Sequence, residues 1–183
     1  MSASQTFDLT PKQVEAMKCI TTDAKHSALG GGSRSGKTFL LVLALITRAL
    51  KAANSRHAVF RYRFNSVKAS VVLDTLPKVM KMCYPGLWEN SKLDKTDWYI
   101  TFPNGSEIWF GGLDDKDRTE KILGMEFATI YFNECSQIPY MSYITAKTRL
   151  AQKSGLRLKF YFDFNPPSKR HWTFRTFIEK VDV

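Results

Sequence analysis

Apolar positions along the chain fall into segments with helical spacing and segments that are short continuous runs. Helical spacing predicts helices at 11–20, 39–46 and 67–82. Runs of aromatic and β-branched residues predict buried strands at 58–63, at 127–132 and from Arg157 onwards, and a shorter apolar segment occupies 27–29. Strands and helices in this succession predict an α/β fold with a mostly parallel central sheet flanked by helices.

Local signals mark the ends of the predicted helices. Thr10 suits an N-cap, and Pro11 suits the first helical position behind it. Asn65 or Ser66 is expected to cap the helix at 67–82.

An Asn-Gly turn joins two later segments. Residues 97–102 and 106–111 each alternate apolar and polar positions, and Asn104 and Gly105 lie between them. Asn-Gly in this setting favours a two-stranded β-hairpin. The sequence therefore predicts a hairpin inserted into the sheet.

A glycine-rich stretch separates the apolar segment at 27–29 from the helix at 39–46. Its glycines and its Lys-Thr pair fit the phosphate-binding pattern G-x-x-x-x-G-K-[ST] in every required place. Backbone N–H groups of such a loop converge on phosphate oxygens, while the Lys37 ammonium reaches the β- and γ-phosphates. The Thr38 hydroxyl can ligate Mg²⁺. The sequence predicts a nucleoside triphosphate site formed by Gly31, Gly32, Ser33, Arg34, Ser35, Gly36, Lys37 and Thr38.

Charge, cysteine content and hydropathy indicate the kind of partner and cellular compartment to expect. Twenty-seven Lys and Arg against 17 Asp and Glu give a net charge of +10, which favours a polyanionic partner without identifying one. Cys19, Cys83 and Cys135 are scattered without metal-ligand spacing, which suits a reducing cytosol. No segment approaches the roughly 20 apolar residues of a membrane span, so no membrane association is expected.

The run at 127–132 ends in Asn133 and Glu134, the layout of a Walker B strand. In the usual Asp-Glu pair, the Asp holds Mg²⁺ through water and the Glu polarises the attacking water. The Asn133 amide oxygen can still accept a bond from metal-bound water, but it brings no negative charge. Glu134 is the candidate general base. A separation of about 95 residues from the P-loop is typical of ATPases with an additional strand between these two strands.

Other polar residues follow two further predicted strands. Asn165 follows the last strand and is expected to contact the γ-phosphate or its water, although Asn-Pro is also a common turn. Arg61, Arg63 and Lys68 lie where the strand at 58–63 ends, at the edge where parallel sheets bind ligands. Solvated surface charge is the alternative for each of these three cations.

Gln13 lies ahead of the P-loop, in the first turn of the helix at 11–20. A glutamine amide offers one donor and one acceptor, which match the N6 and N7 edge of adenine. From this segment alone, a surface glutamine on a capped helix is the alternative.

Together these residues resemble one family, the ATPase domain of the large terminase subunit of tailed bacteriophages, the motor that packs DNA into procapsids. The resemblance covers nearly the whole chain, and its specificity lies in the order and spacing of the segments. They are 9–13, 30–38, 103–106, 121–124, 130–134 and 165–167, followed by His171 and Trp172.

This resemblance implies a P-loop NTPase of the additional-strand, catalytic-glutamate type. It makes Gln13 the adenine-reading glutamine, Arg34 a phosphate contact within the same subunit, and Asn165 part of the motif that couples hydrolysis to movement. ATP and Mg²⁺ are the implied cofactors. Double-stranded DNA, the phage portal and the small terminase subunit are the implied partners. The chain is expected to be a monomer alone and a homo-oligomeric ring during packaging, in the host cytoplasm and transiently docked on the procapsid.

The chain departs from the family pattern at three places. Asn133 replaces the common aspartate. Leu123 takes the place of the trans-acting arginine of some relatives, which leaves Arg118 and Lys121 as the nearest candidate trans fingers. Full-length large terminases continue into a nuclease domain, so residues 1–183 are expected to be the ATPase domain without nuclease activity. DNA contacts are expected at Arg61, Arg63, Lys68, Lys169 and Arg170.

Two other functions stay open on the sequence alone. A helicase core shares the glutamine, the P-loop and the Walker B strand, but its Walker B pair has an Asp and a second ATPase domain follows it. A nucleotide-gated DNA-binding module would hold ATP without turning it over.

Overall fold

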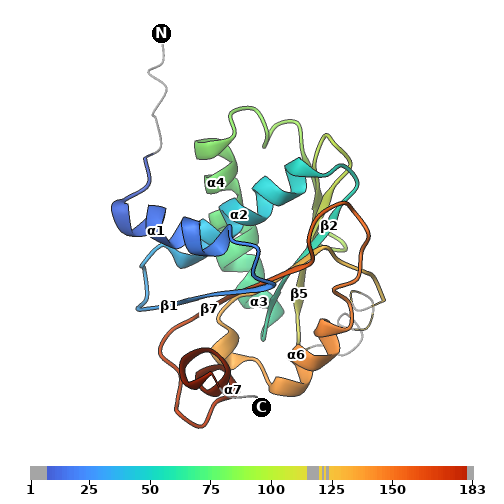
Figure 1. Cartoon of the computed structure of the whole chain (residues 1–183). Helices are drawn as coiled ribbons and strands as arrows, with labels where there is room; N and C mark the ends of the chain where they lie inside the picture. Colours follow the sequence, from blue (N-terminus) through green and yellow to red (C-terminus); the bar gives the residue numbers. More distant parts are fainter. Residues whose placement is uncertain (1–7, 115–119, 121, 123, 181–183) are drawn as a thin grey trace.

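The computed structural model describes residues 8–114, 120, 122 and 124–180. This part of the chain forms a seven-stranded sheet with helices on both faces (Figure 1). The order of strands in the sheet is β1-β7-β6-β2-β5-β4-β3. Their bounds are β1 His26–Gly30, β2 Arg56–Arg61, β3 Lys92–Asp94, β4 Tyr99–Thr101, β5 Glu107–Gly112, β6 Thr129–Phe132 and β7 Lys159–Phe164.

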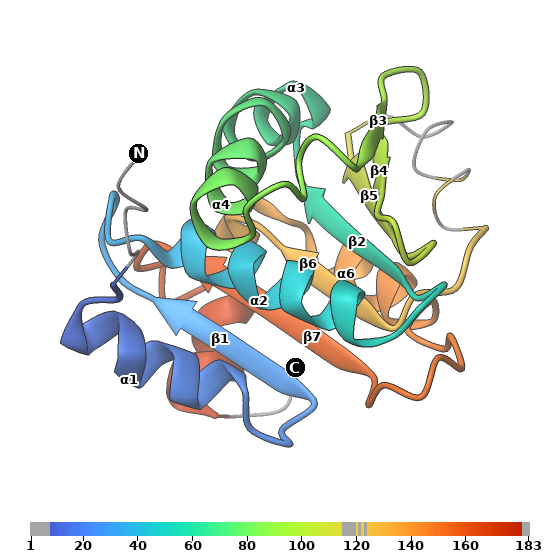
Figure 2. The same ribbon diagram turned by 90° about the horizontal axis from the view of Figure 1, so that it is seen from above.

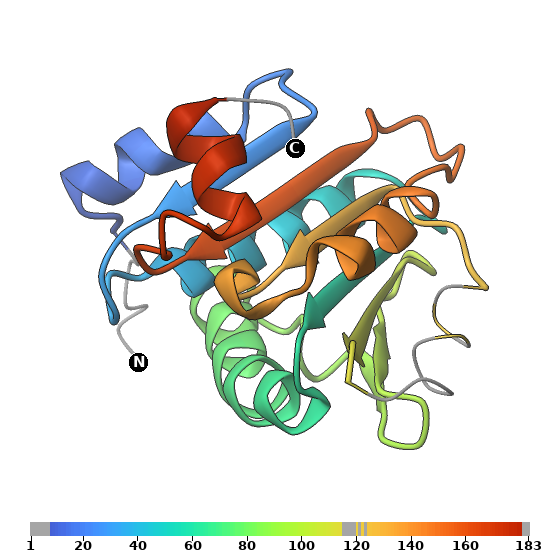
Figure 3. The ribbon, with the colours of Figure 1, turned by 90° about the horizontal axis from the view of Figure 1, so that it is seen from below.

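Helices cover the sheet in two layers. Figure 2 shows α2 and α4 over one face, and Figure 3 shows α6 and α7 over the other. The α-helices are α1 Pro11–Ile20, α2 Lys37–Lys51, α3 Phe64–Val67, α4 Leu76–Cys83, α6 Tyr140–Lys147 and α7 Trp172–Phe174. The chain also forms two π-helices, Lys68–Thr75 and Arg175–Glu179, and a 3-10 helix, Cys135–Gln137.

Strand order confirms the predicted fold type. Strands β1, β7, β6, β2 and β5 pair in parallel, and β7 lies between the P-loop strand β1 and the strand β6 that ends before Asn133. β7 is therefore the additional strand. Because these strands are parallel, their carboxyl ends meet at one edge of the sheet, where α/β proteins bind ligands.

The two helical layers enclose two apolar cores. Successive side chains of a strand point to opposite faces, so each strand contributes alternate residues to each core. The core under α2 and α4 contains the strand residues Val59, Ile108, Phe110, Tyr131 and Tyr161. The core under α6 and α7 contains Ala58, Phe60, Trp109, Ile130, Phe132, Phe160, Phe162 and Phe164.

The hairpin prediction is confirmed. β4 and β5 pair antiparallel around the turn, and the Gly105 N–H donates to the Phe102 carbonyl at 2.9 Å. Gly105 has a φ of +77°, which glycine adopts without strain. The short strand β3, which the sequence pattern did not predict, pairs with β4 at the edge of the sheet.

The predicted helix at 67–82 is present, but it is longer than predicted and is not α-helical throughout. Helical structure begins earlier in α3, passes through the π-helix Lys68–Thr75 and returns to α-helix in α4. Arg63 is the N-cap residue and makes no side-chain cap bond, so neither Asn65 nor Ser66 caps the helix. Pro77 lies in the first turn of α4 and has no N–H to donate backwards, which favours a wider turn before it.

The predicted strand at 58–63 is displaced by two residues, since β2 ends at Arg61. Arg63 therefore lies beyond the strand. Among the described residues, no helix is long and apolar enough to span a bilayer.

Candidate nucleotide-binding and catalytic site

One cavity of about 430 Å³ lies at the carboxyl edge of the parallel strands. The P-loop follows β1, Glu134 is the second residue after β6, and Asn165 follows β7 directly. The topology thus brings together three segments that are far apart in sequence. The cavity is lined by Ser33, Arg34, Ser35, Gly36, Lys37, Thr38, Phe39, Asp74, Thr75, Lys78, Glu134, Asp163 and Asn165.

The P-loop backbone has left-handed residues at its crown and at its end. Gly36, the N-cap of α2, has a φ of +79°, which explains the glycine required there. Arg34 has a φ of +60°, a conformation that costs a non-glycine residue free energy. Its side chain is exposed and lines the cavity.

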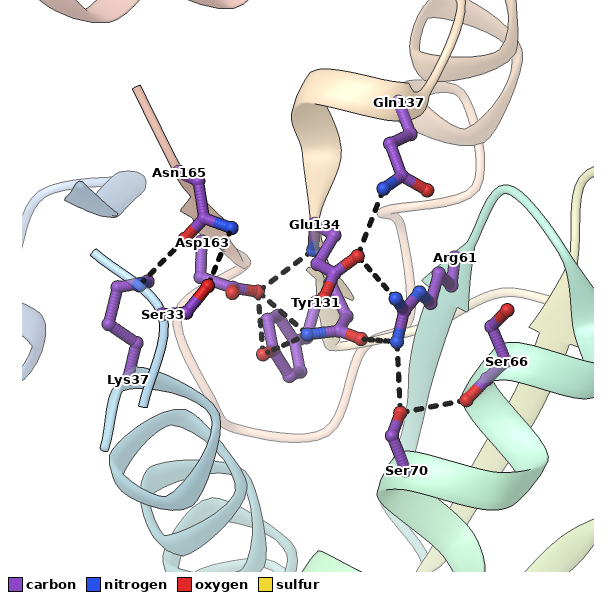
Figure 4. A network of polar contacts seen from close by, with 11 residues as sticks. Ser33, Lys37, Arg61, Ser66, Ser70, Tyr131, Glu134, Gln137, Asp163 and Asn165 are labelled. Carbon is purple, nitrogen blue, oxygen red and sulfur yellow. Dashed lines mark hydrogen bonds and ion pairs between the residues drawn. The ribbon is translucent and has the colours of Figure 1, made fainter. Parts of the chain in front are cut away.

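Lys37 connects the P-loop to the segment after β7. Its ammonium donates to the carbonyls of Gly31 at 2.8 Å and Gly32 at 2.7 Å, and to Asn165 Oδ1 at 3.3 Å. The Asn165 amide in turn lies 3.5 Å from Ser33 Oγ (Figure 4). Asn165 therefore contacts both the P-loop lysine and the loop itself.

Glu134 is held by partners on two sides. Its carboxylate forms an ion pair with Arg61 and accepts a hydrogen bond from Gln137 Nε2 at 3.1 Å. The Arg61 guanidinium also donates to Ser70 Oγ at 3.0 Å, so the π-helix fixes its position (Figure 4). The Arg61 side chain is only 14% exposed. This arrangement does not favour Arg61 as a DNA contact, because its guanidinium is largely covered and already paired.

Asn133 turns its amide oxygen away from the cavity. Oδ1 accepts a 3.4 Å hydrogen bond from Arg61, while Nδ2 donates to Tyr131 and to Asp163 Oδ1 at 2.9 Å. A flipped amide would set its N–H group against a cation and its oxygen against a carboxylate, so the surrounding charges fix this orientation. Asn133 is 2% exposed and does not line the cavity. The expectation that Asn133 holds Mg²⁺ through water does not fit this geometry.

Asp163 is the site residue that the sequence reasoning missed. It lies near the end of β7, is 3% exposed and lines the cavity with Lys37 and Thr38. Burial raises the pKa of its carboxyl group, and hydrogen bonds from Tyr131, Asn133 and the Glu134 backbone oppose that rise. A lone carboxylate in an otherwise aromatic strand is costly to bury unless it is paired, and this was the signal in the sequence that marked it.

Gln13 lies beside the P-loop, and its acceptor oxygen already accepts one hydrogen bond within the protein. Oε1 accepts a 2.9 Å bond from the Thr10 N–H, and Thr10 accepts in return, which forms a capping box at the start of α1. Nε2 faces the loop so closely that a Cβ at Gly36 would come within 2.9 Å of it. Adenine recognition by Gln13 remains a prediction, for which Oε1 has a second lone pair left to accept a hydrogen bond.

The predicted DNA contacts differ in their surroundings. Arg63, Lys169 and Arg170 are exposed. The Lys68 ammonium lies 4.4 Å from the centre of the Trp98 ring, a cation–π contact. Arg118 and Lys121, the candidate trans fingers, lie outside the described residues.

The residues around the cavity fit Mg²⁺. Within the described residues, no group of three or more His, Cys, Asp or Glu side chains forms a metal cage. Mg²⁺ needs none, since it keeps several waters and binds one or two carboxylates together with substrate phosphates. The Thr38 hydroxyl at the start of α2 and a buried carboxylate in the same cavity supply such a partial set.

Comparison with known proteins agrees with the geometry. Residues 23–183 match the family model described as phage terminase large subunit. No curated protein sequence matches the chain significantly.

Solved structures share the fold. The large terminase of a thermophilic bacteriophage has a TM-score of 0.81 at 20% identity over 95% of this chain and 43% of its own. The bacteriophage HK97 large terminase has a TM-score of 0.71 at 14% identity, and the match covers 95% of this chain and 38% of the terminase. The N-terminal domain of the bacteriophage phi29 packaging ATPase has a TM-score of 0.61 at 16% identity. The match covers 95% of this chain and 87% of that domain. This chain thus spans less than half the length of the first two of these proteins. The terminase of the thermophilic bacteriophage has also been crystallised with ADP and with ATP-γ-S.

Proposed function

This chain is a member of the phage terminase large subunit family, and from that premise we propose that it is the ATP-hydrolysing motor domain of a DNA-packaging machine. The observation that carries the proposal is the single cavity in which a P-loop lysine, a glutamate and a strand-end asparagine meet. Each of these residues has a separate task in the proposed reaction.

Nucleotide binding falls to the P-loop. Backbone N–H groups at the positive end of α2 receive the phosphates, and the Lys37 ammonium exchanges its bonds to the Gly31 and Gly32 carbonyls for phosphate oxygens. Mg²⁺, when bound, offsets the charge of the phosphates. Gln13, at the other side of the loop, is the candidate for adenine.

Hydrolysis falls to Glu134 as general base. It accepts a proton from the water that attacks the γ-phosphate, while Arg61 and Gln137 hold the carboxylate in place. Arg34 acts on the phosphate from within the same subunit, where a planar guanidinium can form two parallel bonds to phosphate oxygens.

Coupling falls to Asn165. Its side chain contacts both Lys37 and Ser33, so a change in the P-loop lysine on hydrolysis alters the contacts of the segment after β7. The exposed Lys169 and Arg170 continue that same segment. Nucleotide turnover is thereby linked to residues that face DNA.

The motor acts on double-stranded DNA as a ring of subunits docked on the procapsid portal, with the small terminase subunit as partner, in the host cytoplasm. A packaging motor must grip any sequence, so its DNA contacts go to phosphates. The net charge of +10 supplies the cations for such contacts.

The test measures phosphate release from ATP and movement along duplex DNA in the same preparation. A third strand bound to the duplex is displaced by a translocating motor without separation of the two duplex strands. We expect ATP-dependent displacement by the wild-type chain assembled with its partners, and none by Glu134→Gln. Strand separation in place of displacement would favour the helicase alternative, and ATP binding without phosphate release would favour the nucleotide-gated module.

A further inference from the structure

The buried negative charge of this site lies on a different strand from the usual one. A Walker B strand carries an aspartate where β6 is followed by Asn133. The neighbouring strand β7 carries Asp163, whose Oδ1 lies 2.9 Å from Asn133 Nδ2. β7 is also the strand beside β1, so this carboxylate lies one strand closer to the P-loop strand.

Asp163 uses one oxygen for the protein and leaves the other for the cavity. Oδ1 accepts hydrogen bonds from Tyr131 Oη at 2.7 Å, from Asn133 Nδ2 and from the Glu134 N–H at 3.1 Å. All three donors meet this one oxygen (Figure 4). From the described residues, Oδ2 receives no hydrogen bond. Because Asp163 lines the cavity while Oδ1 faces inward, Oδ2 is the oxygen directed at a ligand.

The Thr38 hydroxyl and the Asp163 carboxylate belong to the same cavity. Tyr131 is fully buried beneath the site, and its hydroxyl donates to Asp163 Oδ1. The residue expected to bind Mg²⁺ through its hydroxyl and the buried carboxylate therefore line one space.

We propose that Asp163, in place of Asn133, supplies the carboxylate of the Mg²⁺ site, binding the ion directly or through one water together with the Thr38 hydroxyl. This inference rests on the proposed ATPase function. Asp163 is assigned to the Mg²⁺ site by its position and also because the other carboxylates that line the cavity are less suitable. Of the other carboxylates that line the cavity, Glu134 is paired with Arg61, and Asp74 is exposed on the π-helix.

The experiment measures how Mg²⁺ concentration controls the binding of ATP-γ-S. Asp163→Asn is expected to raise the half-saturating Mg²⁺ concentration by roughly 10–100-fold, the usual effect of losing a supporting metal partner. Binding of ATP-γ-S in EDTA should change far less, because the P-loop contacts remain. Asp23→Asn, the same chemical change at an exposed position far from the cavity, should leave both values as in the wild type. An unchanged Mg²⁺ dependence in Asp163→Asn would overturn the inference, as would loss of that dependence in Asp74→Asn alone.

Asn133→Asp gives the opposite test. If residue 133 held the ion, a carboxylate there would strengthen Mg²⁺ binding. We expect no strengthening, because the new carboxylate would face Asp163 at hydrogen-bonding distance and the two like charges would repel each other. Tighter Mg²⁺ binding by Asn133→Asp would contradict the assignment.

A measurement that leaves Asp163 in place covers the case in which Asp163→Asn does not fold. Mn²⁺ and ATP-γ-S are bound to the chain labelled with ¹³C at its aspartate carboxyl carbons, in an Asp74→Asn background. Electron–nuclear double resonance should detect a carboxyl carbon beside the ion, and its absence would refute the inference. A wild-type chain that fails to bind ATP-γ-S at all would instead count against the proposed function.

Discussion

Two cavities of similar size lie at opposite ends of the same parallel strands, and their side chains are arranged differently. The cavity at the carboxyl edge has a volume of about 430 Å³ and the one at the amino edge about 400 Å³. Both are lined by cations. At the amino edge these include Arg48, Lys51, Arg157 and Lys159.

Three of these cations, Arg48, Arg157 and Lys159, already have partners within the protein. Arg48 Nε donates to Thr129 Oγ1 at 2.8 Å and its Nη2 to the Arg157 carbonyl. Lys159 donates to the Thr22 carbonyl, and Arg157 pairs with Asp23 at 2.8 Å. Cavity volume therefore does not identify the functional site. What distinguishes the carboxyl edge is the P-loop together with Arg34 and Asp163 Oδ2, which make no hydrogen bond to the described residues and so keep bonding capacity for a ligand.

The largest expected effect belongs to Arg34. Arg34→Ala should lower the turnover number by about 10³-fold while ATP affinity changes little, because its guanidinium offsets charge in the transition state. Steady-state phosphate release and equilibrium binding of ATP-γ-S measure the two quantities. Arg34→Lys should restore little of the rate, since a point charge cannot form two parallel bonds. Lost affinity with a normal rate would make Arg34 a ground-state contact only.

Glu134→Gln should lower turnover by roughly 10²-fold or more, the scale of general-base catalysis, and keep nucleotide affinity. Single-turnover phosphate release isolates the chemical step. Glu107→Gln is a matched control, because Glu107 also pairs with an arginine of β2 but at the amino end of that strand. Equal rates for Glu134→Gln and wild type would remove Glu134 as the base.

His57 tests whether polar groups at the amino edge serve stability. It is fully buried at the start of β2, and burial lowers its pKa to about 3. Below its ordinary pKa near 6.5 the unfolded chain binds a proton that the folded chain does not, so stability falls as pH falls from about 6.5 toward 3. Between about pH 7 and pH 5 the free energy of unfolding should fall by about 2 kcal/mol from this residue.

Urea denaturation of the wild type and His57→Gln at both pH values measures that change. The variant should have a lower free energy of unfolding than the wild type at pH 7. That free energy should then fall less than in the wild type when the pH is lowered to 5. Equal slopes for the two proteins would mean that His57 is not the group responsible.

The smallest expected effect concerns DNA. The affinity for duplexes of unrelated sequence should be similar and should fall with salt, each phosphate contact adding about 0.9 to the slope of log affinity against log salt. Arg170→Ala should reduce that slope by about 0.9, and Lys25→Ala, at the amino edge, should not. Fluorescence anisotropy with labelled duplexes measures the slopes. Salt-independent affinity, or a strong preference for one sequence, would contradict this assignment of the charge.

Much of the fold follows from local chemistry. Thr10 and Pro11 predict the start of α1, Asn104 and Gly105 predict the hairpin, and aromatic runs locate the strands. The break into a π-helix before α4 was not predictable, because apolar spacing over one or two turns is nearly the same in both helix types. The short edge strand β3 also lacks an apolar run of its own.

The sequence predicted the positions of several candidate site residues, and their roles stay predictions. The P-loop pattern locates Lys37 and Thr38, and the strand end locates Glu134. The pairing of Glu134 with Arg61 joins residues on two strands and depends on β2 and β6 being neighbours, which no local pattern states. The same holds for Asp163, whose partners come from β6.

One helix provides the most direct test of the central claim that the carboxyl edge binds nucleotide. Lys37 and Lys51 are the first and last residues of α2, and each lines one of the two cavities. Calorimetric titration of ATP-γ-S with Mg²⁺ should give the same affinity for wild type and Lys51→Ala. Lys37→Ala should bind at least about tenfold more weakly, because a hydrogen bond from a charged donor contributes about 1.5–3 kcal/mol. Binding by Lys37→Ala that equals the wild type, or loss of binding in Lys51→Ala, would contradict the account.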